Sequence, residues 1–186
     1  MLCWIDMEMT GLNEASDCIM EIATVITDYA LQPLDEGLEF VIKQPRQVLE
    51  AMKEPVLSMH ANSGLTNACL TSSTTLAEAE GKTLSYITKH ISQAKTAPLC
   101  GNSVHTDRRF LRKFMPSIDE HLHYRIVDVS SVRLLADIWF PEAVQKRPPK
   151  SENHRALGDI LESIQELKFY RDHVFAGEKS ATAVQL

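Results

Sequence analysis

The feature that most constrains this chain is its first segment, a short apolar run that carries two acidic residues and stops at Gly11. Residues 2–9 (LCWIDMEM) are typical of a β-strand. Alternate residues of a strand share a face, so Asp6 and Glu8 stand side by side while the other face is wholly apolar. Acidic residues are poor strand formers and repel each other in this arrangement. Two explanations are possible: a divalent cation held between the carboxylates offsets their repulsion, or the strand is a half-exposed edge strand with a polar face. The acidic pair alone does not distinguish them.

Size and composition limit the possible functions. The chain has 186 residues, and we expect one well-packed domain over residues 1–175 and a flexible tail over 176–186. The formal net charge of −6 disfavours non-specific coating of long nucleic acid. No apolar run approaches the length of a membrane span, and the four scattered cysteines lack any C-x-x-C pair. We therefore expect reduced thiols and no membrane partner, in an intracellular protein of the cytoplasm or the mitochondrial matrix.

The order of the remaining elements predicts a mixed α/β fold. Strands over 17–28 and 38–43 would form an antiparallel meander with the first strand. Helices and strands then alternate: short helical pieces in 44–67, a helix opened by the Thr75–Glu78 capping box and running to about 94, a strand at 97–100, a helix at 106–115, a strand at 124–129, a helix capped by Ser130 or Ser131 and running to 139, and a last helix at about 153–172. This order predicts a mixed sheet flanked by helices, with ligands at the carboxyl ends of strands, where Asp6 and Glu8 lie.

Three further residues occur where a metal site would need them. Asp107 lies in the first turn of a predicted helix, where an acidic residue is favourable in any protein. Asp159 lies among apolar residues of the last helix and needs a partner, either a metal ion or a neighbouring arginine. His154 is a candidate base toward water near neutral pH, or a solvated helix cap. A two-metal phosphodiesterase site needs three or four carboxylates around two ions about 3.5–4 Å apart.

Four motifs in order carry a resemblance to a known family. They are DMEMTGL at 6–12, GNSVHTDRRFL at 101–111, HYR at 123–125 and HRALGDI at 154–160. Together they resemble the oligoribonucleases, DEDD-type 3′-to-5′ exonucleases of the histidine branch, over about residues 2–175. The resemblance implies an α/β fold of the ribonuclease H-like exonuclease type.

The resemblance also implies roles for individual residues. By analogy, two Mg²⁺ or Mn²⁺ ions are held by Asp6, Glu8, Asp107 and Asp159, and His154 is the general base. The implied substrates are short single-stranded RNAs, down to dinucleotides, which a homodimer cleaves from the 3′ end to nucleoside 5′-monophosphates. The implied substrate contacts are Leu12 as a wedge against the terminal bases, His60 in the cleft, and Ser103, Arg125 and Ser130 at the 5′ phosphate, with Tyr124 and Arg125 contributed by the partner subunit.

Two positions depart from the family pattern. Pro55 stands where the family usually has a tryptophan that stacks on a base, a contact worth about 1–3 kcal/mol, which leaves Leu57 or Met59 to supply it. Gly158 replaces an aspartate beside the last metal ligand, and a glycine inside a helix costs up to about 1 kcal/mol relative to alanine. Two alternatives remain, namely a related exonuclease that acts mainly on DNA and an inactive relative that binds short nucleic acids.

Overall fold

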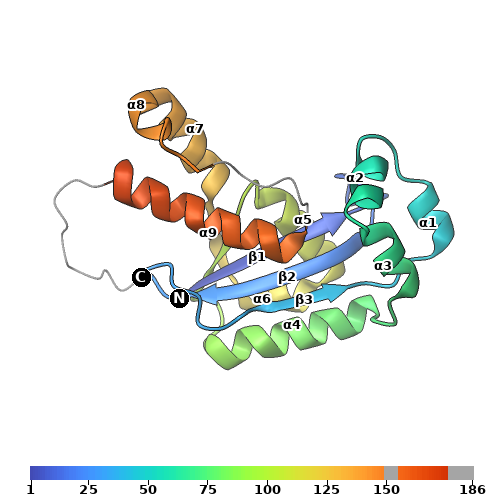
Figure 1. Ribbon diagram of the computed structural model, residues 1–186. Helices are drawn as coiled ribbons and strands as arrows, with labels where there is room; N and C mark the ends of the chain where they lie inside the picture. The colour runs from blue at the N-terminus through green and yellow to red at the C-terminus, as the bar shows by residue number, and fades with distance from the viewer. Residues whose placement is uncertain (149–154, 176–186) are drawn as a thin grey trace.

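A five-stranded mixed sheet lies at the centre of the protein (Figure 1). The computed structural model describes residues 1–148 and 155–175, so His154 and the predicted tail at 176–186 lie outside the described residues. The strands, in the spatial order β3-β2-β1-β4-β5, are β1 (Leu2–Met9), β2 (Ile19–Thr27), β3 (Leu38–Val41), β4 (Pro98–Gly101) and β5 (His123–Asp128). β1, β2 and β3 form the predicted antiparallel meander, whereas β4 and β5 run parallel to β1. The expected α/β fold with a mixed sheet is confirmed.

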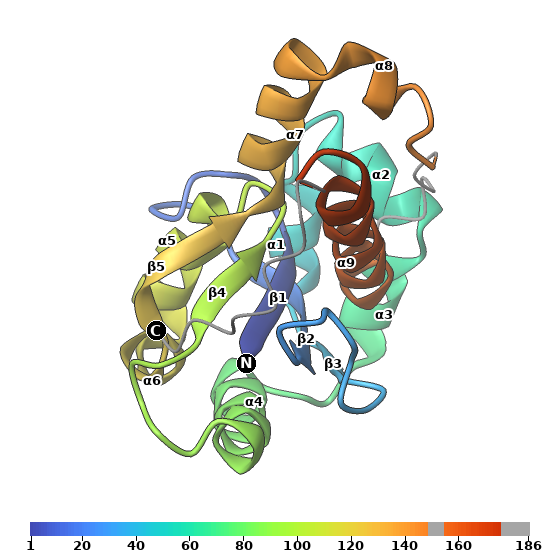
Figure 2. The same ribbon diagram turned by 90° about the vertical axis from the view of Figure 1, so that its left-hand side faces the viewer.

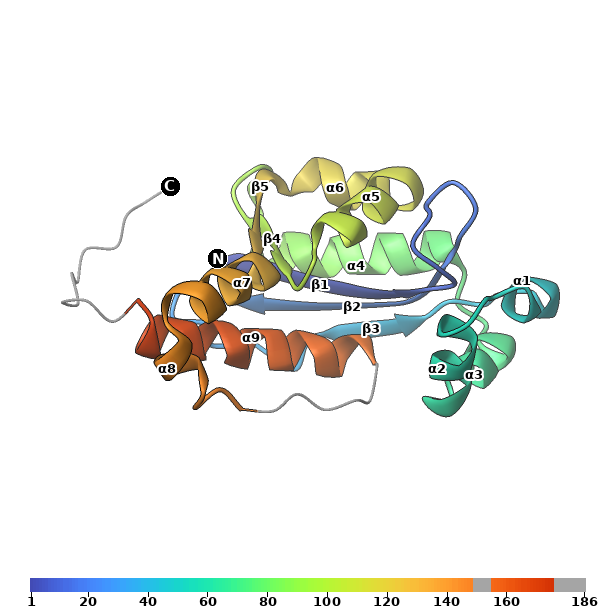
Figure 3. The ribbon, with the colours of Figure 1, turned by 90° about the horizontal axis from the view of Figure 1, so that it is seen from above.

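Helices cover both faces of this sheet and one of its ends. They are α1 (Arg46–Glu50), α2 (Val56–Asn62), α3 (Leu65–Thr71), α4 (Leu76–His90), α5 (His105–Phe114), α6 (Pro116–His121), α7 (Val129–Trp139), α8 (Pro141–Val144) and α9 (Ala156–His173). Figure 3 shows α4, α5 and α6 on one side of the sheet and α9 on the other. In Figures 1 and 2, α1, α2 and α3 gather beyond the end of the sheet to which β1 points. Within the described segments, no helix is both long and apolar enough to cross a membrane.

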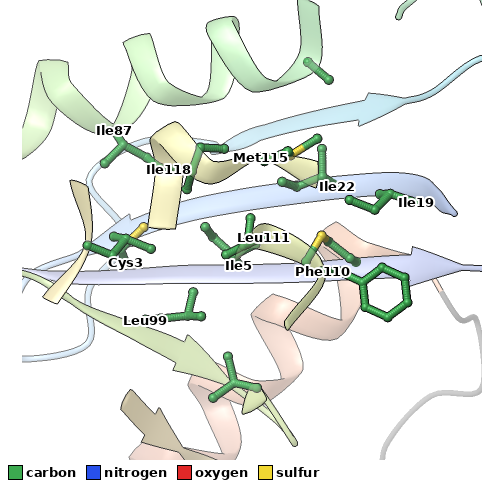
Figure 4. Packing of buried hydrophobic residues seen from close by; sticks show 14 of the residues in the cluster. Cys3, Ile5, Ile19, Ile22, Ile87, Leu99, Phe110, Leu111, Met115 and Ile118 are labelled. Carbon is green, nitrogen blue, oxygen red and sulfur yellow. The ribbon is translucent and has the colours of Figure 1, made fainter. Parts of the chain in front are cut away.

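The two faces of β1 belong to two different cores. Cys3, Ile5 and Met7 pack against Phe110 and Leu111 of α5, and this core continues to α4 and α6 (Figure 4). On the opposite face, Trp4 joins a second core that contains apolar residues of α7 and α9. Because alternate residues of a strand share a face, Asp6 and Glu8 point with Trp4 toward the α9 layer. The fold therefore directs the acidic pair at one particular helix.

Several element boundaries differ from the predicted ones for physical reasons. The cap of α7 is Asp128, which accepts a hydrogen bond from the Ser130 N–H at 2.9 Å, so neither Ser130 nor Ser131 is the cap. Pro116 and Pro141 do more than end the preceding helices; each begins a short helix, α6 and α8, because proline suits the first helical turn. The Thr75 capping box does open α4, as predicted, although the helix ends at His90.

Candidate active site

Carboxylates from the first strand and the last helix meet at the carboxyl end of β1. Ligand oxygens of Asp6, Glu8 and Asp159 lie within 4.8 Å of one another, and we call these three residues the acidic cluster. Asp159 belongs to the first turn of α9, which packs on the face of the sheet to which Asp6 and Glu8 point. Such spacing allows carboxylates to share a bound cation, with water or substrate oxygens completing its coordination.

Asp107 approaches the same strand from the first turn of α5, the helix that follows β4. β4 runs parallel to β1, so the chain leaves β4 at the same end of the sheet as the carboxyl end of β1. The Asp107 side chain is 5% exposed, and its Oδ1 accepts a hydrogen bond from the Met7 N–H at 3.1 Å. Met7 is the residue between Asp6 and Glu8. The four acidic residues that were predicted as metal ligands therefore lie together at the carboxyl end of β1.

Burial raises the pKa of Asp6, Glu8 and Asp107. The pKa of Asp6 lies well above its ordinary value, first because the group is buried and then because Asp107 and Glu8 repel its charge. Burial, followed by repulsion from Asp159 and Glu21, raises the pKa of Glu8 to about 8. Burial likewise raises the pKa of Asp107 to about 7. A cation would relieve this repulsion, and a donor set made only of carboxylate oxygens fits Mg²⁺ or Mn²⁺ better than softer metals.

His60 lies behind the acidic cluster. Its side chain is 0% exposed, and its Nε2 donates to the Met9 carbonyl oxygen at 2.9 Å, because a carbonyl can only accept. Its Nδ1 is 3.9 Å from Glu8 Oε2. The sequence led us to expect His60 in the substrate cleft. In this structure it contacts the end of β1 and lies beside Glu8 of the cluster, and its contact with a substrate stays a prediction.

The start of α9 is held by an ion pair that sequence analysis missed. Glu21 of β2 lies directly across from Glu8 and is fully buried. Its carboxylate accepts hydrogen bonds from Arg155 Nη2 at 2.6 Å and from the Ala156 N–H at 3.0 Å. We call this contact the Glu21–Arg155 clamp; Glu39 of β3 lies 3.4 Å from Arg155 Nη2 on the same guanidinium group. Negative charge at a helix N-terminus is favourable, so the clamp fixes the turn that carries the last carboxylate. An acidic residue inside the apolar segment 17–28 was the available signal.

Ser103 and Ser130 lie together just beyond the ends of β4 and β5. Their Oγ atoms are 3.2 Å apart. The Ser103 N–H is shared between Asp128 Oδ1 and Ser130 Oγ, each at 3.0 Å. Ser103 has a φ of 50°, a left-handed conformation that is uncommon outside glycine, and these acceptors hold it there. The Ser103 side chain faces solvent, so this pair forms a ready hydrogen-bonding surface.

Tyr124 and Arg125 lie away from this serine pair, near the start of the edge strand β5. Both are exposed, and the guanidinium carbon of Arg125 is 5.4 Å from the centre of the Tyr124 ring. Arg125 lines a pocket of about 330 Å³ with Lys95 and Pro98, at the amino ends of β4 and β5. It is about 10 Å along the strand from Asp128, given the rise of a strand per residue. The structure thus brings Ser103 and Ser130 together but does not bring Arg125 to them within one chain.

The remaining predicted positions lie at the surface or beside the cluster. Leu12 is 68% exposed on the turn after β1, and its carbonyl accepts a hydrogen bond from Arg109 Nη2 of α5 at 3.2 Å. Pro55 is exposed just before α2, whereas Leu57 and Met59 are half-buried in that helix. Gly158 is exposed in the first turn of α9, and a Cβ built there meets no described atom within 4 Å.

The fold and the acidic cluster define a class of protein, the exonucleases. Residues 3–167 match the family model described as Exonuclease. Among solved structures, E. coli exonuclease I in complex with a dT13 oligonucleotide has a TM-score of 0.70 and 15% identity, with 92% of this chain and 41% of that chain covered. Exonuclease I from Methylocaldum szegediense has a TM-score of 0.68 and 17% identity, with 94% and 41% covered. The chain thus spans about two-fifths of those larger proteins and shares their fold.

Curated relatives narrow the class to a family. An oligoribonuclease of Streptomyces avermitilis is 50% identical over 185 residues, which is 98% of this chain and 92% of that protein. An oligoribonuclease of Streptomyces griseus is 51% identical over 174 residues, 94% of this chain and 86% of that protein. The chain therefore belongs to the oligoribonuclease family and is a 3′-to-5′ exonuclease, a hydrolase of phosphodiester bonds.

Proposed function

We propose that the protein is a 3′-to-5′ exoribonuclease that degrades short single-stranded RNA, down to dinucleotides, to nucleoside 5′-monophosphates. The observation that carries this proposal is the convergence of the acidic cluster, within 4.8 Å, in a chain half identical to oligoribonucleases. Asp107 lies beside that cluster on the backbone of β1. The net charge of −6 agrees with a short substrate held by a few local contacts, since long polymers need many basic ones.

The acidic residues would hold two divalent ions, Mg²⁺ or Mn²⁺. Asp6, Glu8, Asp107 and Asp159 are the residues that would hold them. Bound ions of this kind lower the pKa of an attacking water and stabilise the negative charge that develops on the phosphate and on the departing oxygen. The raised pKa values of Glu8 and Asp107 mean that these side chains release protons when a cation binds.

His154 is the proposed general base. In this role its imidazole takes the proton from the water that attacks phosphorus, and the bond to the 3′-oxygen of the remaining chain breaks. His154 lies outside the described residues, but it directly precedes Arg155, which the Glu21–Arg155 clamp ties to β2. The clamp therefore anchors both the residue after the base and the helical turn that carries Asp159.

Substrate recognition is assigned to the two ends of a short RNA. Leu12, exposed on the turn after β1, would wedge against the terminal bases at the 3′ end. Ser103 and Ser130 would form the contact surface for the 5′ phosphate, with the Ser103 hydroxyl as the donor. Tyr124 and Arg125 of a second subunit would complete that contact, which agrees with their distance from the two serines within one chain.

A homodimer is part of the proposal because β5 and α7, which follow each other in the chain, both expose large apolar side chains. These are Tyr124, Ile126, Leu134, Ile138 and Trp139. Edge strands and large apolar patches on a protein surface are common places for self-association. A Trp139→Glu variant should sediment as a monomer in analytical ultracentrifugation where the unmodified protein sediments as a dimer.

The proposed location is intracellular, in the cytoplasm or the mitochondrial matrix. All four cysteines are free thiols, and three of them, Cys3, Cys69 and Cys100, are buried. Free thiols are typical of reducing compartments.

A second candidate function, cleavage of DNA, is favoured by the fold shared with an exonuclease I bound to a dT oligonucleotide. Hydrolysis of an RNA dinucleotide, the matching DNA dinucleotide and longer single strands with Mn²⁺ distinguishes the candidates. We expect the RNA dinucleotide to give mononucleotides fastest, with no product after chelation by EDTA. Preferred cleavage of DNA would replace the proposal by the second candidate. Dinucleotide binding without cleavage would instead indicate an inactive relative.

A further inference from the structure

A chain of hydrogen bonds connects the Ser103–Ser130 pair to the helix that carries Asp159. The Ser103 N–H donates to Ser130 Oγ at 3.0 Å, and Ser130 Oγ donates to Asn102 Oδ1 at 3.1 Å. Asn102 Nδ2 donates to Ser163 Oγ at 2.6 Å, and Ser163 Oγ donates to the Asp159 carbonyl oxygen at 2.7 Å. We call this series of bonds the Asn102 relay. It joins the proposed 5′-phosphate contact to the backbone of a proposed metal ligand.

The direction of every bond in the Asn102 relay is determined by its two ends. A backbone N–H can only donate and a backbone carbonyl can only accept, so the hydroxyl groups between them must each accept from one side and donate to the other. Asn102 suits the middle position because its amide offers an acceptor at one atom and a donor at the next. Ser163 is 3% exposed, so water cannot readily replace its two partners.

Only one hydroxyl of the serine pair is left for a ligand. The hydrogen of Ser130 is used by Asn102, and its oxygen is approached by both the N–H and the hydroxyl of Ser103. The hydroxyl hydrogen of Ser103 can turn outward without breaking the relay. Ser103 is therefore the direct donor to a phosphate, and Ser130 supports it.

The turn that contains Asn102 is also pinned to the first strand. Gly101 precedes Asn102, and a Cβ built on Gly101 would lie 3.1 Å from the Ile5 carbonyl oxygen. Ile5 is the residue before Asp6. Because the turn packs closely on β1, it cannot deform freely, and a displacement of Ser103 also displaces its neighbour Asn102.

We propose that Asn102 is a positioning residue that couples contact of a substrate's 5′ phosphate at Ser103 to the placement of Asp159 in the acidic cluster. This inference rests on the proposed function for its substrate. Its consequence is that a 5′ phosphate on a dinucleotide raises the turnover number, in addition to any effect on binding.

The test uses Ser163, whose hydroxyl joins Asn102 to the Asp159 carbonyl oxygen. We would measure kcat and KM for a 5′-phosphorylated RNA dinucleotide and for its 5′-hydroxyl counterpart. Ser163→Ala should lower kcat for the phosphorylated substrate by about fivefold to tenfold and leave kcat for the hydroxyl substrate unchanged. Ser163→Thr, which keeps a hydroxyl, should restore the difference. Combining Ser163→Ala with Asn102→Ala should add nothing to Asn102→Ala alone, because both break one relay.

The matched control is Ser85→Ala in α4. Ser85 Oγ donates to the Gly81 carbonyl oxygen at 2.8 Å, the same bond to the preceding turn that Ser163 makes with Asp159. This variant should leave both substrates unaffected. A second measurement follows the amide NMR signals of α9 in EDTA: the phosphorylated dinucleotide should shift the Asp159 signal in the unmodified protein and not in Ser163→Ala.

The possible results separate this inference from the proposed function. If Ser163→Ala lowered kcat equally for both substrates, the relay would be a structural contact without a role in coupling. A change confined to KM would overturn the coupling to Asp159. If the unmodified protein cleaves neither dinucleotide, the proposed function itself is wrong, and this inference falls with it.

Discussion

Replacing Glu8 by glutamine should make the metal-free protein more stable. The Glu8 side chain is 8% exposed, and its pKa is raised from 4.5 to about 8 by burial and then by Asp159 and Glu21. An acid whose pKa is raised by folding stabilises the folded state at low pH only. That stability is complete below pH 4.5 and is lost as the pH rises toward 8. Glutamine has nearly the same shape and carries no charge, so it removes this dependence on pH.

The size of the effect follows from the interval between the ordinary pKa and the working pH. One pKa unit corresponds to about 1.4 kcal/mol. At pH 7 the Glu8 carboxyl is ionised in the unfolded chain and protonated in the folded one, so folding must take up a proton. The cost is set by the difference between pH 7 and the ordinary pKa of 4.5, and it amounts to about 3 kcal/mol. We therefore expect Glu8→Gln to raise the free energy of unfolding by up to about 3 kcal/mol at pH 7 and by almost nothing at pH 4.

Urea denaturation in EDTA at several pH values between 4 and 8 measures this difference. Glu120→Gln, at an exposed glutamate of α6, is the control and should match the unmodified protein throughout. Adding Mn²⁺ should reverse the order, because the unmodified protein gains more stability from the cation than Glu8→Gln does. Equal stabilities of Glu8→Gln and the unmodified protein at pH 7 without metal would refute the reasoning about the cluster.

Further predictions address the site and its supports. Asp6→Ala should abolish release of mononucleotides while circular dichroism stays unchanged; normal turnover would remove Asp6 from the metal site. Arg125→Ala should lose the preference for dinucleotides over longer RNA in a competition assay, and an unchanged preference would exclude it from the 5′ contact. Arg155→Met should lower the free energy of unfolding by about 3 kcal/mol in urea, because it leaves Glu21 buried without its counter-charge. Gly158→Ala should raise that free energy by up to about 1 kcal/mol, as should Gly81→Ala in α4, since neither new Cβ meets a described atom within 4 Å.

Sequence reasoning succeeded where the determining interactions are local. The alternation in residues 2–9 predicted β1 and its apolar face, because side-chain direction in a strand depends only on position along the chain. The Thr75–Glu78 capping box predicted the start of α4, because both hydrogen bonds close within four residues. The family motifs selected four carboxylates that the structure brings together at the carboxyl end of β1, while their role as metal ligands stays a prediction.

Contacts between distant segments left little trace in the sequence. Glu21 and Arg155 are 134 positions apart, and nothing in the spacing of either residue predicts their ion pair. The burial of His60 against the end of β1 was not predictable either, because the direction of a side chain on a short helix depends on how that helix packs. The cap of α7 was assigned to a serine because the reach of Asp128 from the end of β5 depends on the turn geometry. The domain boundary at residue 175, the homodimer and the role of His154 stay predictions.

The acidic cluster draws on opposite ends of the polypeptide, with Asp6 in the first strand and Asp159 in the last helix. A growing chain on the ribosome therefore lacks Asp159, one of the proposed metal ligands, until most of the sequence has been synthesised. Proteolytic cleavage between the two ends would likewise leave fragments that each lack part of the centre. The acidic cluster can thus form only after the last helix has been synthesised.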